Sequence, residues 1–305
     1  MNTVKTGALM AGLTALVMAI GYGVGRTNGM IYAFGLAAVM NFVSYWYSDK
    51  MVLAMTHAQE VGPAEAPQLY ALVKRLTERD GLPMPRLYIV PDPTPNAFAT
   101  GRDPRHAAVA VNHGLLEILN EDEVEGVIAH ELSHVKHRDI LISTIAATMA
   151  GALVMLSRMA WWGMMLGGYG GGDGGERRRD EGGMSPIGAL VMIIVAPIAA
   201  LIIQLAISRS REYAADESGG RLTKRPQSLA SALLKLERQN ERLPSPTATP
   251  ATAHMYIVNP LQVGVLASLF STHPPIEDRV ARLEALARQI GAAPRSRTST
   301  GRGLV

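Results

Sequence analysis

The segment His130-Glu131-Leu132-Ser133-His134 contains two histidines four positions apart, with a glutamate directly after the first. On an α-helix, residues four apart lie on the same face, about 6 Å apart along the axis, so both imidazoles can bind one metal ion. Glu131 is rotated about 100° from His130, so it stands beside such an ion and can accept a proton from water. The pattern predicts a zinc site with its own general base, as in zinc-dependent peptidases.

The residues around this segment favour the helix that the site requires. Asn120 and Glu123 have the spacing of a capping box, and the residues of the first turn, 121–123, are all acidic. An apolar stripe at helical spacing follows, made of Val124, Val127, Ile128 and Val135. The alternative is a helix whose two histidines are merely surface groups.

A third ligand must come from elsewhere in the chain. The sequence contains no cysteine, so His, Asp or Glu must complete the site. The best candidate is Glu212, which has Asp216 four positions later on a predicted helix. Asp216 would then accept a hydrogen bond from the outer nitrogen of His130 and fix its tautomer. The alternative is a solvated helix face on which Arg209 and Arg211 pair with the two acids.

Composition indicates a membrane protein. The chain has 305 residues, of which 48% are hydrophobic and 18% charged, and its mean hydropathy is +0.13. The net charge of +3 is spread along the chain, with no basic stripe interleaved with aromatic residues, which excludes nucleic acid as an expected partner. We therefore expect the lipid bilayer, and proteins in or at it, to be the partners.

Four apolar runs are long enough to cross a bilayer, namely 7–25, 30–47, 140–166 and 187–207. The first two, joined by a tight turn at 26–29, predict a helical hairpin; a cleaved signal peptide is the alternative for the first run. A Gly-rich charged stretch at 167–183 predicts an exposed loop between the last two runs. If His134 and Glu212 share one ion, the last two runs must both cross or both stay out. Lys5, Lys50, Arg209 and Arg211 put this shared side in the cytoplasm, whereas Arg177–Arg179 disagree.

The remaining segments predict a small mixed domain. A helix is expected at 68–79, strands at 87–90 and 107–111, a helical turn at 114–120, and an amphipathic helix at 275–290. The second strand, through Ala108, Val109 and Ala110, is a candidate rail for an extended substrate, because a peptide can add to a sheet edge. The equally open alternative is an ordinary core strand.

The chain resembles the HtpX family of bacterial membrane-bound heat-shock metallopeptidases, and more distantly the CAAX prenyl proteases and Oma-type peptidases. The resemblance covers nearly the whole length, through the N-terminal hairpin, Asn96–Gly101, His130–His134 with Asp139, Ser208–Asp216, and Ser271–Pro275 with Arg279. It implies one zinc ion held by His130, His134 and Glu212, with Asp216 and Asp139 behind the ligands. It also implies a gluzincin-type fold and cleavage of damaged or misassembled membrane proteins at the bacterial inner membrane.

Peptide hydrolysis also needs a donor for the developing oxyanion, for which Tyr213, His273 and Arg279 are the candidates. His273 has the alternative of starting a helix before Pro274. Asn96 either contacts substrate or shapes a turn after Pro95.

The predicted fold is mainly α with a small sheet, a zinc peptidase domain beside four membrane helices. Its parts are an N-terminal hairpin (1–47), a peptidase domain in two pieces (48–139 and 208–291), a second pair of spans (140–207) and a disordered basic tail (292–305). Two rival interpretations stay open. One is a scaffold that keeps zinc only for stability; the other is an intramembrane protease, which the charges of the zinc helix disfavour.

Overall fold

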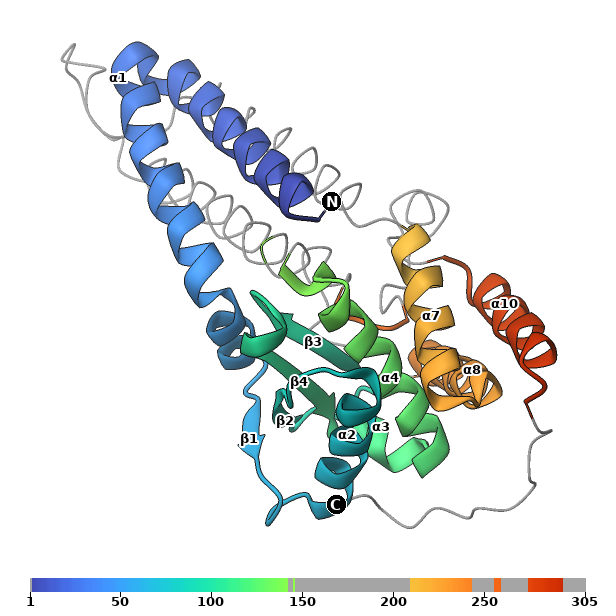
Figure 1. Cartoon of the computed structure of the whole chain (residues 1–305). Coiled ribbons are helices and arrows are strands. Elements are labelled where there is room, and N and C mark those ends of the chain that lie inside the picture. The colour runs from blue at the N-terminus through green and yellow to red at the C-terminus, as the bar shows by residue number, and fades with distance from the viewer. Residues whose placement is uncertain (1, 142–144, 146–208, 243–254, 259–273, 293–305) are drawn as a thin grey trace.

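The computed structural model describes residues 2–141, 145, 209–242, 255–258 and 274–292 of the chain (Figure 1). Within these residues the fold is mainly helical with one four-stranded sheet. Most of the third predicted span, the whole of the fourth, the loop 167–183, His273 and the tail from 293 lie outside the described residues.

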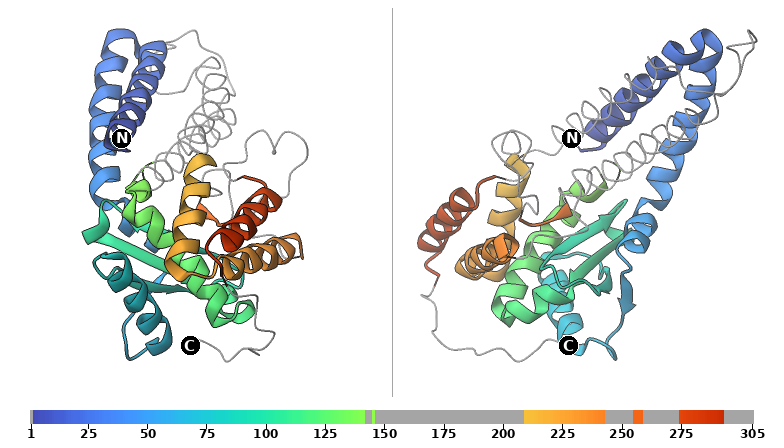
Figure 2. Two further views of the ribbon diagram at one scale, coloured as in Figure 1. Left: turned by 45° about the vertical axis from the view of Figure 1, so that its right-hand side comes forward. Right: turned by 180° about the vertical axis from the view of Figure 1, so that it is seen from behind.

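Helix α1 (Asn2–Met55) forms the predicted hairpin, which extends away from the sheet and the other described helices (Figures 1 and 2). Its helix is interrupted at Gly25 and Arg26, whose backbone angles leave the helical region, and there the chain turns back. The two legs touch closely, because a Cβ atom at Gly21 would lie 2.5 Å from the carbonyl oxygen of Gly29. Asn41 Nδ2 donates to Thr14 Oγ1 across the legs at 2.8 Å.

One described segment is long and apolar enough to cross a membrane, Gly25–Tyr47 in the second leg; the apolar helix of the first leg, Met10–Gly23, is shorter. Only 11% of the most apolar window of that segment is buried, and aromatic side chains such as Tyr32 and Phe42 are exposed on it. An exposed apolar helix of this kind fits a lipid surrounding better than a protein core.

The sheet has the strand order β1-β2-β4-β3. Strands β1 (Gln59–Val61) and β2 (Arg86–Val90) are antiparallel, β2 and β4 (Ala107–Asn112) are parallel, and β3 (Ala97–Gly101) pairs antiparallel with β4. A 3-10 turn, η1 (Pro104–His106), joins β3 to β4. Strand β4 is therefore internal, and its main chain is hydrogen-bonded to a neighbouring strand on each side.

The two faces of the sheet bury different elements, because side chains alternate along each strand. Leu87, Val109 and Val111 face the main core beneath α2 (Pro67–Asp80) and α4 (Glu121–Lys136). The opposite face packs against the end of α1; the residues of this second cluster are Val52, Leu53, Tyr88, Val90, Phe98, Ala108 and Ala110. The hairpin thus continues without a linker into the sheet.

Helix α4 begins as the sequence predicts. The Asn120 side chain accepts from the backbone N–H of Glu123, and the Glu123 carboxylate accepts from the backbone N–H of Asn120, both at 3.0 Å. Glu123 is buried and also accepts from Ser231 and Lys235 of helix α8 (Pro226–Arg242), each at 2.6 Å. The start of α4 is fixed to α8 as a result.

Helix α4 lies between the sheet and a group formed by α7 (Arg209–Thr223), α8 and α10 (Ile276–Gln289), as Figure 2 shows. The predicted helices 68–79 and 275–290 and the predicted strands 87–90 and 107–111 are confirmed to within two residues. A short helix, α3 (His113–Ile118), occupies the predicted turn at 114–120. Strand β3 and the three-residue β1 were not predicted.

Candidate metal centre

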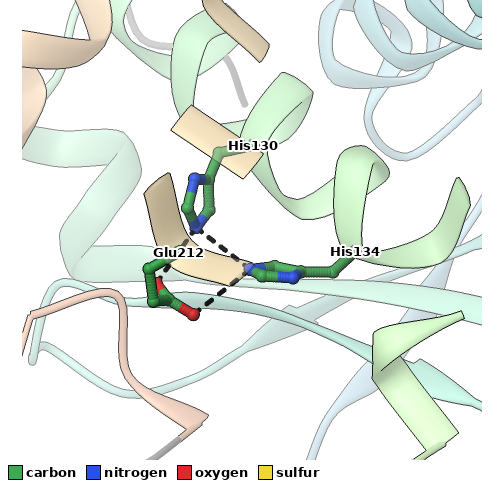
Figure 3. A group of neighbouring side chains, drawn as sticks. All are labelled: His130, His134 and Glu212. Atoms are coloured by element: carbon green, nitrogen blue, oxygen red, sulfur yellow. Dashed lines mark hydrogen bonds and ion pairs between the residues drawn. The ribbon is translucent and has the colours of Figure 1, made fainter. Parts of the chain in front are cut away.

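Helices α4 and α7 bring the three predicted ligands together. His130 and His134 lie one turn apart on α4, and Glu212 reaches them from α7 (Figure 3). Glu212, Asp216 and Gly219 recur at the i, i+4 and i+7 positions of α7, so they share the face that meets α4. A Cβ atom at Gly219 would lie 2.9 Å from the backbone nitrogen of His130, so glycine permits this close approach.

The candidate ligand atoms lie close together. Nε2 of His130 and Nε2 of His134 are 3.2 Å apart; Oε2 of Glu212 lies 3.6 Å from Nε2 of His130, and Oε1 lies 3.5 Å from Nε2 of His134. Zinc bonds of about 2.0–2.1 Å in tetrahedral geometry require ligand atoms about 3.3–3.4 Å apart. Each of these contacts is close to that separation, so the three residues could supply three ligands of one zinc ion.

Acidic groups stand behind both imidazoles. Nδ1 of His130 lies 2.9 Å from Oδ1 of Asp216, within ion-pair distance. Nδ1 of His134 lies 3.4 Å from Oδ2 of Asp139. The other carboxylate oxygen of Asp139, Oδ1, lies 3.5 Å from Nη1 of Arg211. Carboxylates in these positions orient the rings so that both Nε2 atoms face the metal position.

Burial and charge shift the pKa values of the cluster. Burial lowers the pKa of His130, but Asp216 and Glu212 outweigh it and raise the pKa to about 10. Burial raises the pKa of Asp216, yet the Arg279 guanidinium and His130 bring it down to about 2. The surroundings thus favour positive charge between the acids, which a divalent cation supplies while the imidazoles stay neutral.

Glu131 follows His130 on α4 and points to strand β3. Its Oε2 accepts from the backbone N–H of Ala99 at 2.9 Å, and the side chain is buried. Burial raises the pKa of Glu131, with His130 and His134 opposing this in part. A carboxylate with a raised pKa and a fixed orientation suits a general base.

Arg279 lies differently from its predicted role as an oxyanion donor. It is fully buried, and its Nε and Nη2 donate to the two oxygens of Asp216 at 2.8 and 2.7 Å, while Nη1 donates to the carbonyl of Ile257 at 2.8 Å. This guanidinium is committed to holding Asp216. These bonds favour a positioning role for Arg279 over its predicted role as an oxyanion donor.

Tyr213 also turns away from the metal position. Its ring lies 3.8 Å from the Arg282 guanidinium, in a hollow between α7 and α10. One helical position after Glu212 means a rotation of about 100°, which directs the side chain to α10 instead of α4. The geometry gives no support to Tyr213 as an oxyanion donor.

Asn96 is buried, and its amide is engaged within the protein. Its Oδ1 accepts from the backbone N–H of Ile257 at 3.1 Å, and its Nδ2 donates to the carbonyl of Met255 at 3.3 Å. Of the two alternatives for this residue, substrate contact or local structure, these bonds favour structure. Asn96 and Arg279 thus both bond to the segment 255–258.

The predicted substrate rail on β4 is wrong as an edge strand. Ala108, Val109 and Ala110 pair with β2 on one side and β3 on the other, so an extended peptide has no free main chain to meet there. In the described part of the chain, the edge next to α4 is β3 instead. Its short run of small residues hid it from the sequence patterns, although its contact with Glu131 places it at the site.

The comparisons agree with this geometry. The model for "Peptidase family M48" matches residues 63–287, which include all three predicted ligands and Glu131. The chain belongs to peptidase family M48. This M48 chain is therefore a metalloprotease, and the family implies a bound metal.

Relatives place the M48 chain among the HtpX proteases. A "Protease HtpX homolog" of Desulforapulum autotrophicum is 55% identical over 282 residues, covering 92% of this chain and 89% of the relative. A second, of Thermococcus sibiricus, is 53% identical over 289 residues, covering 95% and 97%. The crystal structure of S. mikatae Ste24p has a similar fold, with a TM-score of 0.52 at 17% identity, covering 93% of this chain and 65% of that one.

Proposed function

We propose that this M48 peptidase is a membrane-anchored zinc endopeptidase that hydrolyses peptide bonds of damaged or misfolded membrane proteins, as part of protein quality control under stress. The cluster of His130, His134 and Glu212, whose candidate ligand atoms make contacts of 3.2, 3.5 and 3.6 Å, carries the proposal. It supports one zinc ion per chain, bound by His130, His134 and Glu212. Asp216 and Asp139 would orient the two histidines from behind.

Zinc held there would supply an acidified water and would polarise the scissile carbonyl. Glu131 would accept the proton of the attacking water as the C–O bond forms, and deliver it to the leaving nitrogen as the C–N bond breaks. The bond from Ala99 N–H keeps the Glu131 carboxylate at a fixed orientation during both transfers. The buried surroundings keep bulk water away from this proton.

Substrate would lie along β3. Along an antiparallel pair of strands, hydrogen-bonded residue pairs alternate with pairs that are not hydrogen-bonded. Asn112 N–H donates to the Asn96 carbonyl, so Asn96 belongs to a hydrogen-bonded pair. By alternation, the main-chain N–H and C=O groups of Ala97, Ala99 and Gly101 point away from β4. A peptide extended beside β3 would pass Ala99, and therefore Glu131, with its carbonyl groups close to the metal position.

Membrane anchoring would place this site on the cytoplasmic side of the bacterial inner membrane, with a hairpin at 1–47 and a second pair of spans within 140–207. The exposed apolar helix Gly25–Tyr47 supports the first part of this arrangement. The peptidase domain would then comprise 48–139 and 208–291.

The test compares Glu131→Gln with Glu217→Gln, an exposed glutamate on α7 that pairs with Arg221. Each purified protein is analysed for zinc and for cleavage of one membrane protein in its folded and unfolded forms. We expect both variants to bind about one zinc per chain, while Glu131→Gln loses about 10²–10⁴-fold in hydrolysis because its base is gone. Unchanged cleavage by Glu131→Gln would favour a different base, and a preference for folded membrane proteins would contradict a role in quality control.

A further inference from the structure

The end of the membrane-spanning leg carries a sharp change in side-chain chemistry. Tyr45, Trp46 and Tyr47 are all exposed, and after one serine the charged residues Asp49 and Lys50 follow. Aromatic belts mark the level where the hydrocarbon ends, and charged groups stay outside it. The boundary of the membrane therefore lies close to Trp46.

The turn between β3 and β4 lies at the same level. The guanidinium of Arg102 lies 5.0 Å from the centre of the Trp46 ring, and Arg86, at the same end of the sheet, pairs with Asp49 at 2.9 Å. Arg105 and His106 of the turn are exposed, and Asp103 bonds to His106. This end of the sheet is thus charged, and it faces the level at which lipid headgroups begin.

The leg also fixes the distance between the membrane and the metal centre. Its helix runs on from Tyr47 to Met55, and Val52 and Leu53 pack on the sheet face that carries Phe98. Strand β3 therefore cannot move far from the membrane without breaking a buried contact. Ala99, which bonds to Glu131, is three residues from Arg102.

These contacts set an upper limit on the distance between Ala99, beside the metal centre, and the membrane boundary at Trp46. Three strand residues of about 3.4 Å each, an extended arginine side chain of about 7 Å and the 5.0 Å contact with Trp46 add up to at most about 22 Å. An extended peptide covers that distance with about six residues, and the headgroup layer of about 5–8 Å takes two or three more.

From this we infer that the enzyme selects membrane-proximal bonds: it cuts substrate proteins within about ten residues of the end of their own membrane span. This rests on the proposed function, because it assumes that substrate lies along β3 at the metal centre. It adds a substrate class, namely extended segments that leave the bilayer on the side of the peptidase domain.

The level of the turn is tested by labelling. The chain has no cysteine, so Arg105→Cys on the turn and Glu78→Cys on the exposed side of α2 can each carry one fluorophore without further changes. In vesicles that contain lipids with a quencher on the headgroup, we expect the label at 105 to be quenched and the label at 78 to stay bright. Equal quenching at the two positions would overturn the inference.

The reach is tested with the full-length enzyme in zinc-loaded vesicles. Substrates with one span and a flexible polar tail carry the same cleavable sequence at about 8 or about 32 residues from the span. Because effective concentration falls as about the −3/2 power of linker length, we expect the near site to be cut at least about eightfold faster. Equal rates would refute the membrane-proximal rule. The same cleavable sequence as a free peptide measures the activity of the enzyme itself. If the free peptide is cut and the two membrane-tethered substrates are cut at equal rates, only the membrane-proximal rule is refuted. If no substrate is cut, the proposed function is refuted.

Discussion

Arg279 offers the sharpest test of how the metal centre is supported. It is fully buried and donates to both carboxylate oxygens of Asp216, which is itself 2% exposed. Removing one partner of a buried ion pair costs about 3–5 kcal/mol, because the other charge stays buried without compensation. We expect Arg279→Met to reduce the free energy of unfolding by that amount. For a domain of this size, the midpoint of thermal unfolding would fall by about 6–20 °C.

The physical cause can be separated from a general loss of packing by a double-mutant cycle. In Arg279→Met with Asp216→Asn, neither charge is left alone, so the combined cost should be smaller than the sum of the single costs by about 0.5–3 kcal/mol. Arg279→Lys keeps the charge without the planar fork and should fall between wild type and Arg279→Met. The control is Arg288→Met, an exposed position on the same helix, with an expected effect within about 0.5 kcal/mol.

The assay is thermal unfolding of the detergent-solubilised, zinc-loaded enzyme, followed by its intrinsic fluorescence. A second measurement, competition for zinc with a chelator, should show binding weakened about 10–100-fold in Arg279→Met, because Asp216 no longer holds His130 at a fixed angle. Strictly additive costs in the cycle, together with unchanged zinc affinity, would refute the argument that Arg279 acts through Asp216.

Three further predictions concern the same centre. Gly219→Ala should destabilise the protein by about 1–3 kcal/mol, because the added Cβ would lie 2.9 Å from the His130 backbone nitrogen. The control Gly23→Ala, whose added Cβ would have nothing within 4 Å, should be neutral. Equal unfolding midpoints for the two variants would contradict the close packing at Gly219. The pKa of Asp216 is lowered from 3.8 to about 2, so this carboxylate should contribute stability that is complete above about pH 4 and lost as the pH falls towards 2. In thermal unfolding measured at several pH values, the difference in stability between wild type and Asp216→Asn should therefore become smaller between about pH 4 and about pH 2. A difference that stays constant would argue against this contribution. Removing zinc with a chelator should abolish peptide cleavage and lower the unfolding midpoint. The free energy of unfolding should fall by about 2.7 kcal/mol if free zinc had been present at 100 times its dissociation constant. Adding back one equivalent of zinc should restore both cleavage and stability.

Local chemistry in the sequence was sufficient for a large part of the fold and of the site. The capping box at Asn120 and Glu123 depends on residues three apart, and the pairing of His130 with His134 depends on one helical turn. Such relations follow from the geometry of a single helix, so they need no knowledge of distant contacts. Glu212 and Asp216 were found in the same way, from their own four-residue spacing combined with the absence of cysteine.

The partners of each element were decided only by the tertiary structure. Whether β4 is an edge or a central strand depends on which strands pair with it, and the same alternating sequence is compatible with either. Arg279 has the residue type of an oxyanion donor, but its bonds to Asp216 and Ile257 join positions 63 and 22 residues away. The sequence therefore determined the residues of the candidate metal centre, while long-range packing determined which other residues contact it, because contacts between distant segments leave no periodic trace along the chain.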